Sequence, residues 1–213
     1  TVSRLCLGCM SFGLDSSQKY SWSLGETQSI DIIERALDLG ITFFDTANTY
    51  SWGDSERVLG TAIDGYDTDS LVIASKVFNP PTEEPHKNAT GLSRKTIDQE
   101  LDHTLNRLGI DTLDLYQTHR WDYQTPIEET IRALDATVQD GRTRYIGASS
   151  MWTYQLADAL HTANTHTLES FATMQNHYNL VYREEEREML PYCAQENIGV
   201  IPMFLGKKET DLF

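Results

Sequence analysis

The sequence is poor in cysteine, and this shortage excludes whole classes of protein. Its 213 residues include only three cysteines, Cys6, Cys9 and Cys193, which are too few for the disulfide framework of many small secreted domains. The pair in "CLGC" has no second pair or histidine cluster to complete a four-ligand zinc site. We therefore expect free thiols, a reducing cytoplasmic location and no metal site.

Basic residues are also scarce, because 17 lysines and arginines stand against 32 aspartates and glutamates, for a formal net charge of −15. Such a surface repels phosphate backbones and anionic lipids, which disfavours binding to nucleic acid. Two interpretations of the acidity stay open. It is either ordinary acidic solubility or a halophilic adaptation, in which abundant cations screen the repulsion between carboxylates.

Long apolar runs are missing as well, and no segment reaches the roughly 18 apolar residues that a membrane-spanning helix needs. The opening "TVSRLCLGCM" lacks the charged region, apolar stretch and cleavage site of an export signal. We therefore expect no membrane insertion. The oligomeric state cannot be read from the sequence.

The sequence does contain a regular alternation of short apolar runs and longer segments with helical spacing. The runs are typical of buried strands; they are "RLCLG", "ITFFD", "SLVIASK", "TLDLYQTH", "TRYIGASS", "SFATMQNHY" and "IGVIP". Three of the longer segments end at a glycine, as helices commonly do: Gly40, Gly109 and Gly141. Ser93 and Thr125 are the expected N-caps of the second and third of these helices.

This alternation predicts an α/β fold with a parallel sheet and helices on its faces. No G-x-G-x-x-G follows the first strand, where "LGCMSFG" stands instead, so we predict a (β/α)8 TIM barrel rather than a doubly wound sheet. We expect a single domain over residues 1–213. A full barrel needs about 250 residues, and no eighth strand is recognisable, so we expect the barrel to be incomplete at its C-terminal strand and tail.

Polar residues end three successive apolar runs, and another follows on a loop. They are Asp45 after "ITFF", Lys76 after "LVIAS", His119 after "LDLYQT", and Tyr50 on the loop behind Asp45. Each alone has an ordinary explanation, as a turn cap, a solvated strand end, a core histidine or loop packing. In a TIM barrel, however, the C-terminal strand ends meet at one mouth, so their joint placement favours a catalytic site.

The four side chains also make chemical sense together. A tyrosine with a pKa of about 10 is a reluctant proton donor, and we expect the ammonium of Lys76 to lower the pKa of Tyr50 by stabilising the tyrosinate. A buried lysine needs a carboxylate to stay charged, and Asp45 supplies it. His119 would hold a substrate carbonyl oxygen in line with the tyrosine hydroxyl.

The stretches "GITFFDTANTYSWGDSERVLGTAI", "LVIASKV", "TIDQELDHTLNRLGIDTLDLYQTHRWD" and "YIGASS" resemble the aldo-keto reductase superfamily, in the branch of the potassium-channel β-subunits and YajO-like reductases. The resemblance covers nearly the whole chain, and the acidity suggests a salt-adapted source. It implies a (β/α)8 barrel that binds NADP(H) without a Rossmann motif. It also implies reduction of an aldehyde or ketone by hydride transfer, with Tyr50 as the general acid.

The resemblance assigns site residues as well. Asp45, Tyr50, Lys76 and His119 match the family's catalytic tetrad, and Arg120 and Trp121 match its substrate pocket. The residues that the resemblance places at the cofactor are Cys9, Met10, Asp45, Ser149, Ser150, Gln175, Met203 and Lys207.

Three of these positions depart from the family's pattern. Ser150 stands where asparagine or arginine is usual, and Met203 stands where an aromatic ring stacks on the nicotinamide. Lys207 matches a diphosphate contact only if intervening residues are absent.

Two other functions stay open beside the enzyme. One is a non-catalytic, cofactor-sensing regulatory subunit with the same fold, and the other is a degenerate barrel that binds no cofactor. The intact tetrad favours the enzyme. The sequence does not identify the carbonyl substrate, and the preference for NADPH over NADH rests on the resemblance alone.

Overall fold

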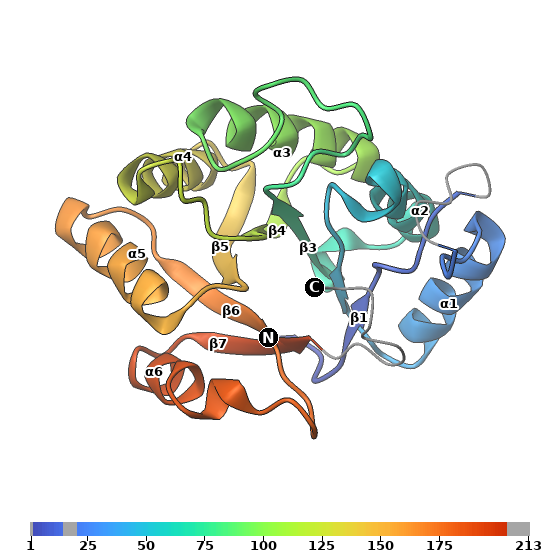
Figure 1. Ribbon diagram of the computed structural model, residues 1–213. Coiled ribbons are helices and arrows are strands. Elements are labelled where there is room, and N and C mark those ends of the chain that lie inside the picture. Colours follow the sequence, from blue (N-terminus) through green and yellow to red (C-terminus); the bar gives the residue numbers. More distant parts are fainter. Residues whose placement is uncertain (1, 15–20, 204–213) are drawn as a thin grey trace.

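The computed structural model describes residues 2–14 and 21–203, in which parallel strands alternate with helices (Figure 1). The strands are β1 (Cys6–Gly8), β2 (Phe43–Asp45), β3 (Val72–Val77), β4 (Leu113–Thr118), β5 (Thr143–Ser149), β6 (Phe171–His177) and β7 (Gly199–Met203). The α-helices are α1 (Glu26–Asp38), α2 (Asp54–Ile63), α3 (Arg94–Leu108), α4 (Ile127–Gln139), α5 (Thr153–His166) and α6 (Met189–Gln195). Short 3-10 helices are η1 (Tyr50–Gly53), η2 (Thr68–Ser70) and η3 (Glu184–Glu186).

The strands form one sheet in chain order from β1 to β7, and every neighbouring pair is parallel. The sheet curls into an open barrel with the helices around its outside (Figure 1). Each predicted strand is confirmed, and so is the parallel α/β architecture. Within the described residues the barrel has seven strands, with β1 and β7 at its two edges. A single domain over residues 1–213 stays a prediction.

Apolar side chains fill the space on both sides of this sheet. The larger cluster lies between the sheet and the helices and includes Ile33, Leu59 and Leu134. A smaller cluster of Phe43, Ala74 and Leu115 comes from β2, β3 and β4. Because side chains alternate between the two faces of a strand, Phe43 shares its face with Asp45, two residues along. The polar residues at the strand ends therefore lie next to this small apolar cluster in the interior of the barrel.

The predicted helix caps are confirmed in one case and wrong in the other. Ser93 caps α3, since its hydroxyl accepts a hydrogen bond from the backbone N–H of Thr96 at 3.3 Å. The prediction for Thr125 is wrong, because α4 begins at Ile127 with Pro126 as its N-cap. The Thr125 hydroxyl instead donates to Asp122 at 2.7 Å, which draws this residue into the preceding turn.

The three cysteines are free thiols, with Cys9 and Cys193 buried and Cys6 partly exposed. In the described part of the chain, no group of three or more His, Cys, Asp or Glu side chains is placed to hold a metal ion. None of the helices in residues 2–14 and 21–203 is long and apolar enough to cross a membrane.

Candidate active site

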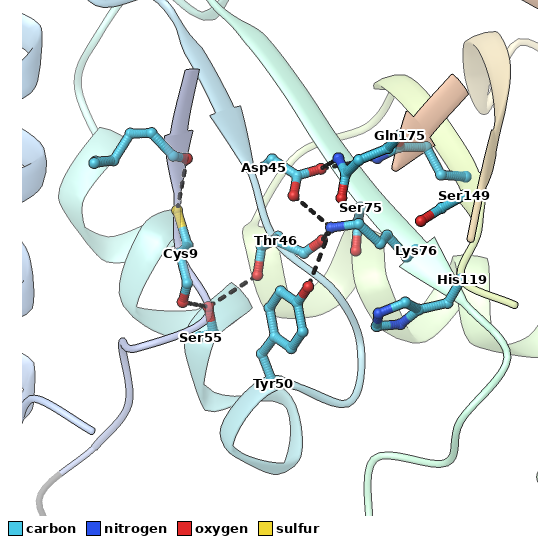
Figure 2. Close-up of polar contacts among 12 residues, drawn as sticks. Cys9, Asp45, Thr46, Tyr50, Ser55, Ser75, Lys76, His119, Ser149 and Gln175 are labelled. Atoms are coloured by element: carbon cyan, nitrogen blue, oxygen red, sulfur yellow. Dashed lines mark hydrogen bonds and ion pairs between the residues drawn. The ribbon is translucent and has the colours of Figure 1, made fainter. Parts of the chain in front are cut away.

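Lys76 lies at the centre of the site and is fully buried on the inner face of the barrel. Its ammonium donates to the Asp45 carboxylate, to the backbone carbonyl of Thr46 at 2.8 Å and to the Tyr50 hydroxyl at 3.4 Å (Figure 2). A lysine ammonium has three N–H donors, so each of them has one acceptor here. The structure therefore brings Asp45, Tyr50 and Lys76 together as the sequence predicted.

The other oxygen of Asp45 is held by two amides. Gln117 on β4 donates its side-chain N–H to Oδ1 at 2.8 Å, and Gln175 on β6 does so at 3.1 Å. Sequence reasoning missed Gln117. The signal was a polar residue two positions before His119, which puts it on the same face of the strand, and the register sets Gln117 directly beside Lys76. The carboxylate is thereby fixed from three strands at once.

Tyr50 is positioned by a loop in an uncommon conformation. Ser51, Trp52 and Gly53 all have positive φ angles, of 48°, 58° and 92°, a region that non-glycine residues rarely enter. The Ser51 hydroxyl donates to the carbonyl of Phe12 at 2.8 Å, and the Arg107 side chain packs so close to Gly53 that a Cβ there would clash with it. These contacts hold the strained turn that points Tyr50 at Lys76.

His119 lies beside the tyrosine, as Figure 2 shows. The two rings meet edge to face, with centroids 5.6 Å apart and planes at 83°. Both side chains line a cavity of about 480 Å³. All four members of the predicted tetrad are therefore adjacent, with Tyr50 and His119 at the cavity and Asp45 and Lys76 buried behind them.

The electrostatics correct one prediction. Burial raises the pKa of Tyr50 above its usual 10.0, and although the Lys76 ammonium pulls it down, the balance stays upward. The expected net lowering is wrong because desolvation of the phenolate outweighs the attraction of the ammonium. For Lys76, burial favours the neutral form, but Asp45 and Tyr50 together raise its pKa. At neutral pH the structure holds a protonated tyrosine against a charged lysine.

The predicted cofactor and substrate contacts mostly share this cavity. Its lining includes Met10, Arg120, Trp121, Ser149, Ser150, Gln175 and Met203. Cys9 is fully buried outside the lining, where its carbonyl accepts a hydrogen bond from Ser55 at 2.7 Å. Lys207 lies outside the described residues.

Two of the lining residues could hold an amide-bearing cofactor. The Ser149 hydroxyl and the Gln175 amide come from paired positions on β5 and β6, and both are almost fully buried. A hydroxyl and an amide oxygen offer the donor and acceptor that a carboxamide needs. The residues present therefore fit the nicotinamide end of a dinucleotide beside Tyr50 and His119.

Comparison with known proteins agrees with this geometry. The model of the aldo/keto reductase family matches residues 4–206. The chain belongs to this family. It is 39% identical to the aldo-keto reductase AMT2 of Alternaria alternata, over 94% of this chain and 60% of that protein. It is also 39% identical to versiconal hemiacetal acetate reductase of Aspergillus parasiticus, over 94% of this chain and 63% of that protein.

A solved structure shows the same fold. The thermostable aldo-keto reductase Tm1743, crystallised with the inhibitor epalrestat, superposes with a TM-score of 0.80 at 29% identity, covering 94% of this chain and 68% of that one. The chain thus spans about 60% of the length of the curated relatives it matches. The narrower branch and the salt-adapted source stay predictions, which these likenesses do not test.

Proposed function

We propose that the chain carries the catalytic site of an NADP(H)-dependent reductase that converts an aldehyde or ketone to an alcohol. One observation carries the proposal: a buried lysine, charged through Asp45, donates to the hydroxyl of a tyrosine that lines a cavity. The family membership and the reductases among its relatives support the same chemistry.

Tyr50 is the proton donor in this proposal. Burial keeps its hydroxyl protonated at neutral pH, so it can donate a hydrogen bond to a carbonyl oxygen in the cavity. As negative charge grows on that oxygen, the proton moves across, and Lys76 at 3.4 Å stabilises the phenolate left behind. Asp45 holds the ammonium in place, and His119 offers a second hydrogen bond to the carbonyl oxygen.

Bound NADPH would supply the hydride. Ser149 and Gln175 would bind the carboxamide of the nicotinamide. One amide N–H of Gln175 is bonded to Asp45, and the carbonyl oxygen of the same side chain would accept a hydrogen bond from the carboxamide. Met10, Ser150 and Met203 line the same cavity and would form the remaining walls around the ring.

A cofactor titration combined with a turnover assay tests the proposal. Nicotinamide fluorescence follows binding of NADPH and of NADH, and loss of NADPH absorbance follows reduction of an aldehyde. We expect NADPH to bind more tightly than NADH and to be oxidised only when an aldehyde is present. At an NADPH concentration 100 times its dissociation constant, the free energy of unfolding should rise by about 2.7 kcal/mol. If NADPH binds without any oxidation, the chain fits the regulatory subunit, for which the comparisons give no support. If neither cofactor binds, the cofactor-free barrel would be correct.

A cytoplasmic location and salt adaptation are also part of the proposal, and they rest on the three free thiols and the net charge of −15. Salt adaptation predicts that the unfolding midpoint rises between low and molar KCl, because cations then screen the surface carboxylates. A flat or falling midpoint would favour ordinary acidic solubility.

A further inference from the structure

Arg120 is a second cation at the cavity, and its charge acts to lower the pKa of Tyr50, though less than the charge of Lys76 does. It directly follows His119 and lines the cavity. Its Nη1 donates to the backbone carbonyl of His119 at 2.8 Å and to the hydroxyl of Ser150 at 2.9 Å. These two bonds hold the guanidinium between the ends of β4 and β5, next to a tetrad residue.

The charge of Arg120 is not balanced within residues 2–14 and 21–203, where no carboxylate lies within 4.0 Å of it. Most other described arginines have such a partner in these residues, although Arg4 and Arg94 do not. Arg142, for example, contacts three aspartates, and Arg107 pairs with Glu56. A guanidinium has five N–H donors in a planar fork. Apart from the two bonds from Nη1, the N–H donors of Arg120 have no acceptor in the described part of the chain.

The other residues that line the cavity bring no carboxylate close to Arg120, and they leave room for a flat, aromatic ligand. Trp121 and Trp152 line it beside Arg120, and the Trp152 side chain is mostly exposed. One acidic side chain lines it, Glu185, which accepts a hydrogen bond from Asn176 at the β6 end. Burial raises the pKa of Glu185.

We propose that Arg120 binds a carboxylate of the substrate, so that the preferred substrates are carbonyl compounds that also carry a carboxylate. This proposal rests on the proposed carbonyl reduction. A fixed guanidinium with free donors suits bidentate recognition of a carboxylate. Its place next to His119 would hold that group close to the reacting carbonyl, while the indole rings cover the body of the molecule.

Two aldehydes of equal size test the proposal, 4-formylbenzoate and its neutral amide, 4-formylbenzamide. Binding of each is followed by quenching of tryptophan fluorescence, because Trp121 and Trp152 line the cavity, and turnover by NADPH oxidation. We expect the native protein to bind the benzoate about ten- to a hundredfold more tightly, the usual effect of a hydrogen bond to a charged group. R120M should bring the ratio of the two affinities to about one.

Two further variants make the test specific. R35M removes the same charge from Arg35, which is exposed on α1 and outside the cavity lining, and it should keep the native preference. R120K keeps the charge but not the planar fork, and it should give an intermediate ratio. Circular dichroism checks that each variant is folded.

The outcomes separate this proposal from the proposed function. Equal affinity of the native protein for the two aldehydes, or a preference that survives in R120M, would overturn the role of Arg120. Binding needs no turnover, so a preference that depends on Arg120 without NADPH oxidation would support the carboxylate site and count against the reductase. Equal turnover of both aldehydes would support the reductase and refute the carboxylate preference.

Discussion

Two buried ion pairs lie on opposite faces of strand β3, and their comparison separates the pair that we propose acts in catalysis from a pair away from the cavity. Lys76 points into the barrel and pairs with Asp45, whereas its neighbour Ser75 faces the helices and donates to Glu56, as the alternation of a strand requires. Glu56 pairs with Arg107 of α3 and accepts a further bond from Thr104. Both pairs are almost completely removed from solvent.

The difference lies in what else each cation contacts. Arg107 also donates to Thr104 and lies 3.8 Å from the carboxylate of Glu100. Glu100 accepts a hydrogen bond from Asn48 on the loop after β2, but none of these side chains lines the cavity. The third N–H of Lys76 instead reaches Tyr50, which lines the cavity. A buried ion pair is weak evidence for stability or function by itself. The contact to Tyr50, a cavity-lining acid, is what supports the proposed catalytic role of the Lys76–Asp45 pair.

Replacing Lys76, the cation of the pair inside the barrel, should have the largest effect on the rate of turnover. In K76M the phenolate of Tyr50 loses its counter-charge, and we expect kcat to fall by about 10³-fold or more. Because the variant also leaves Asp45 unpaired, the double variant D45N/K76M serves as the control. It should recover stability in urea unfolding but not activity. Turnover by K76M within about tenfold of native would remove Lys76 from the mechanism.

Replacing Arg107, the cation of the pair between the sheet and the helices, should instead lower the stability of the fold. R107M leaves the Glu56 carboxylate buried without its partner, and we expect the free energy of unfolding to fall by about 3–5 kcal/mol. The folded fraction should keep kcat within about tenfold of native, because Arg107 makes no hydrogen bond to the tetrad in the described residues. It reaches the loop of Tyr50 through its packing against Gly53 and through Glu100, which accepts a hydrogen bond from Asn48. Urea unfolding and turnover of the same samples measure both. A loss of kcat as large as in K76M, at native stability, would contradict the distinction between the pairs.

Gln117, which also holds the Asp45 carboxylate, tests how much the positioning of the Lys76–Asp45 pair contributes to activity. Q117L removes one amide donor from Asp45, and we expect kcat/KM to fall by about ten- to a hundredfold, since hydrogen bonds to charged groups contribute about 1.5–3 kcal/mol. T173V is the matched control, because Thr173 also lies on the inner face, two residues before Gln175, and makes no bond to Asp45 in the described residues. A Q117L variant as active as T173V would show that Gln175 and Lys76 suffice to hold the carboxylate.

The raised pKa values of Tyr50 and Lys76 predict a small effect at alkaline pH. A folded-state pKa above the unfolded value gives stability that is present below the unfolded pKa, 10.0 for tyrosine and 10.5 for lysine. That stability is lost as pH rises through the folded pKa. We expect unfolding free energy to decrease above about pH 10, by at most about 1.4 kcal/mol per pH unit for each group. Y50F should show a shallower decrease, and an unchanged slope would refute the raised pKa of Tyr50.

The sequence predicted the strands and the tetrad because both depend on local pattern. Apolar runs of a few residues mark the strands, and a polar residue at the end of each run marks the barrel mouth. Gln117 was missed because its partner, Asp45, is 72 residues away and becomes a neighbour only through the register of the sheet. The same holds for Glu56 and Arg107, which are 51 residues apart.

The pKa of Tyr50 could not be predicted from residue types alone. Lysine beside tyrosine argues for a lowered value, but how deeply the ring is buried depends on the whole barrel. The positive φ angles of Ser51 and Trp52 could not be predicted either, because serine and tryptophan do not favour that conformation as glycine does.

The central claim is that Tyr50, supported by Lys76, is the proton donor at the cavity. Its most direct test compares Y50F with Y145F, which removes the hydroxyl of Tyr145, an exposed residue on β5 outside the cavity lining. With saturating NADPH and an aldehyde, we predict that kcat/KM falls by about 10³-fold in Y50F and stays at the native value in Y145F, with NADPH binding retained in both. Native turnover by Y50F would contradict the account.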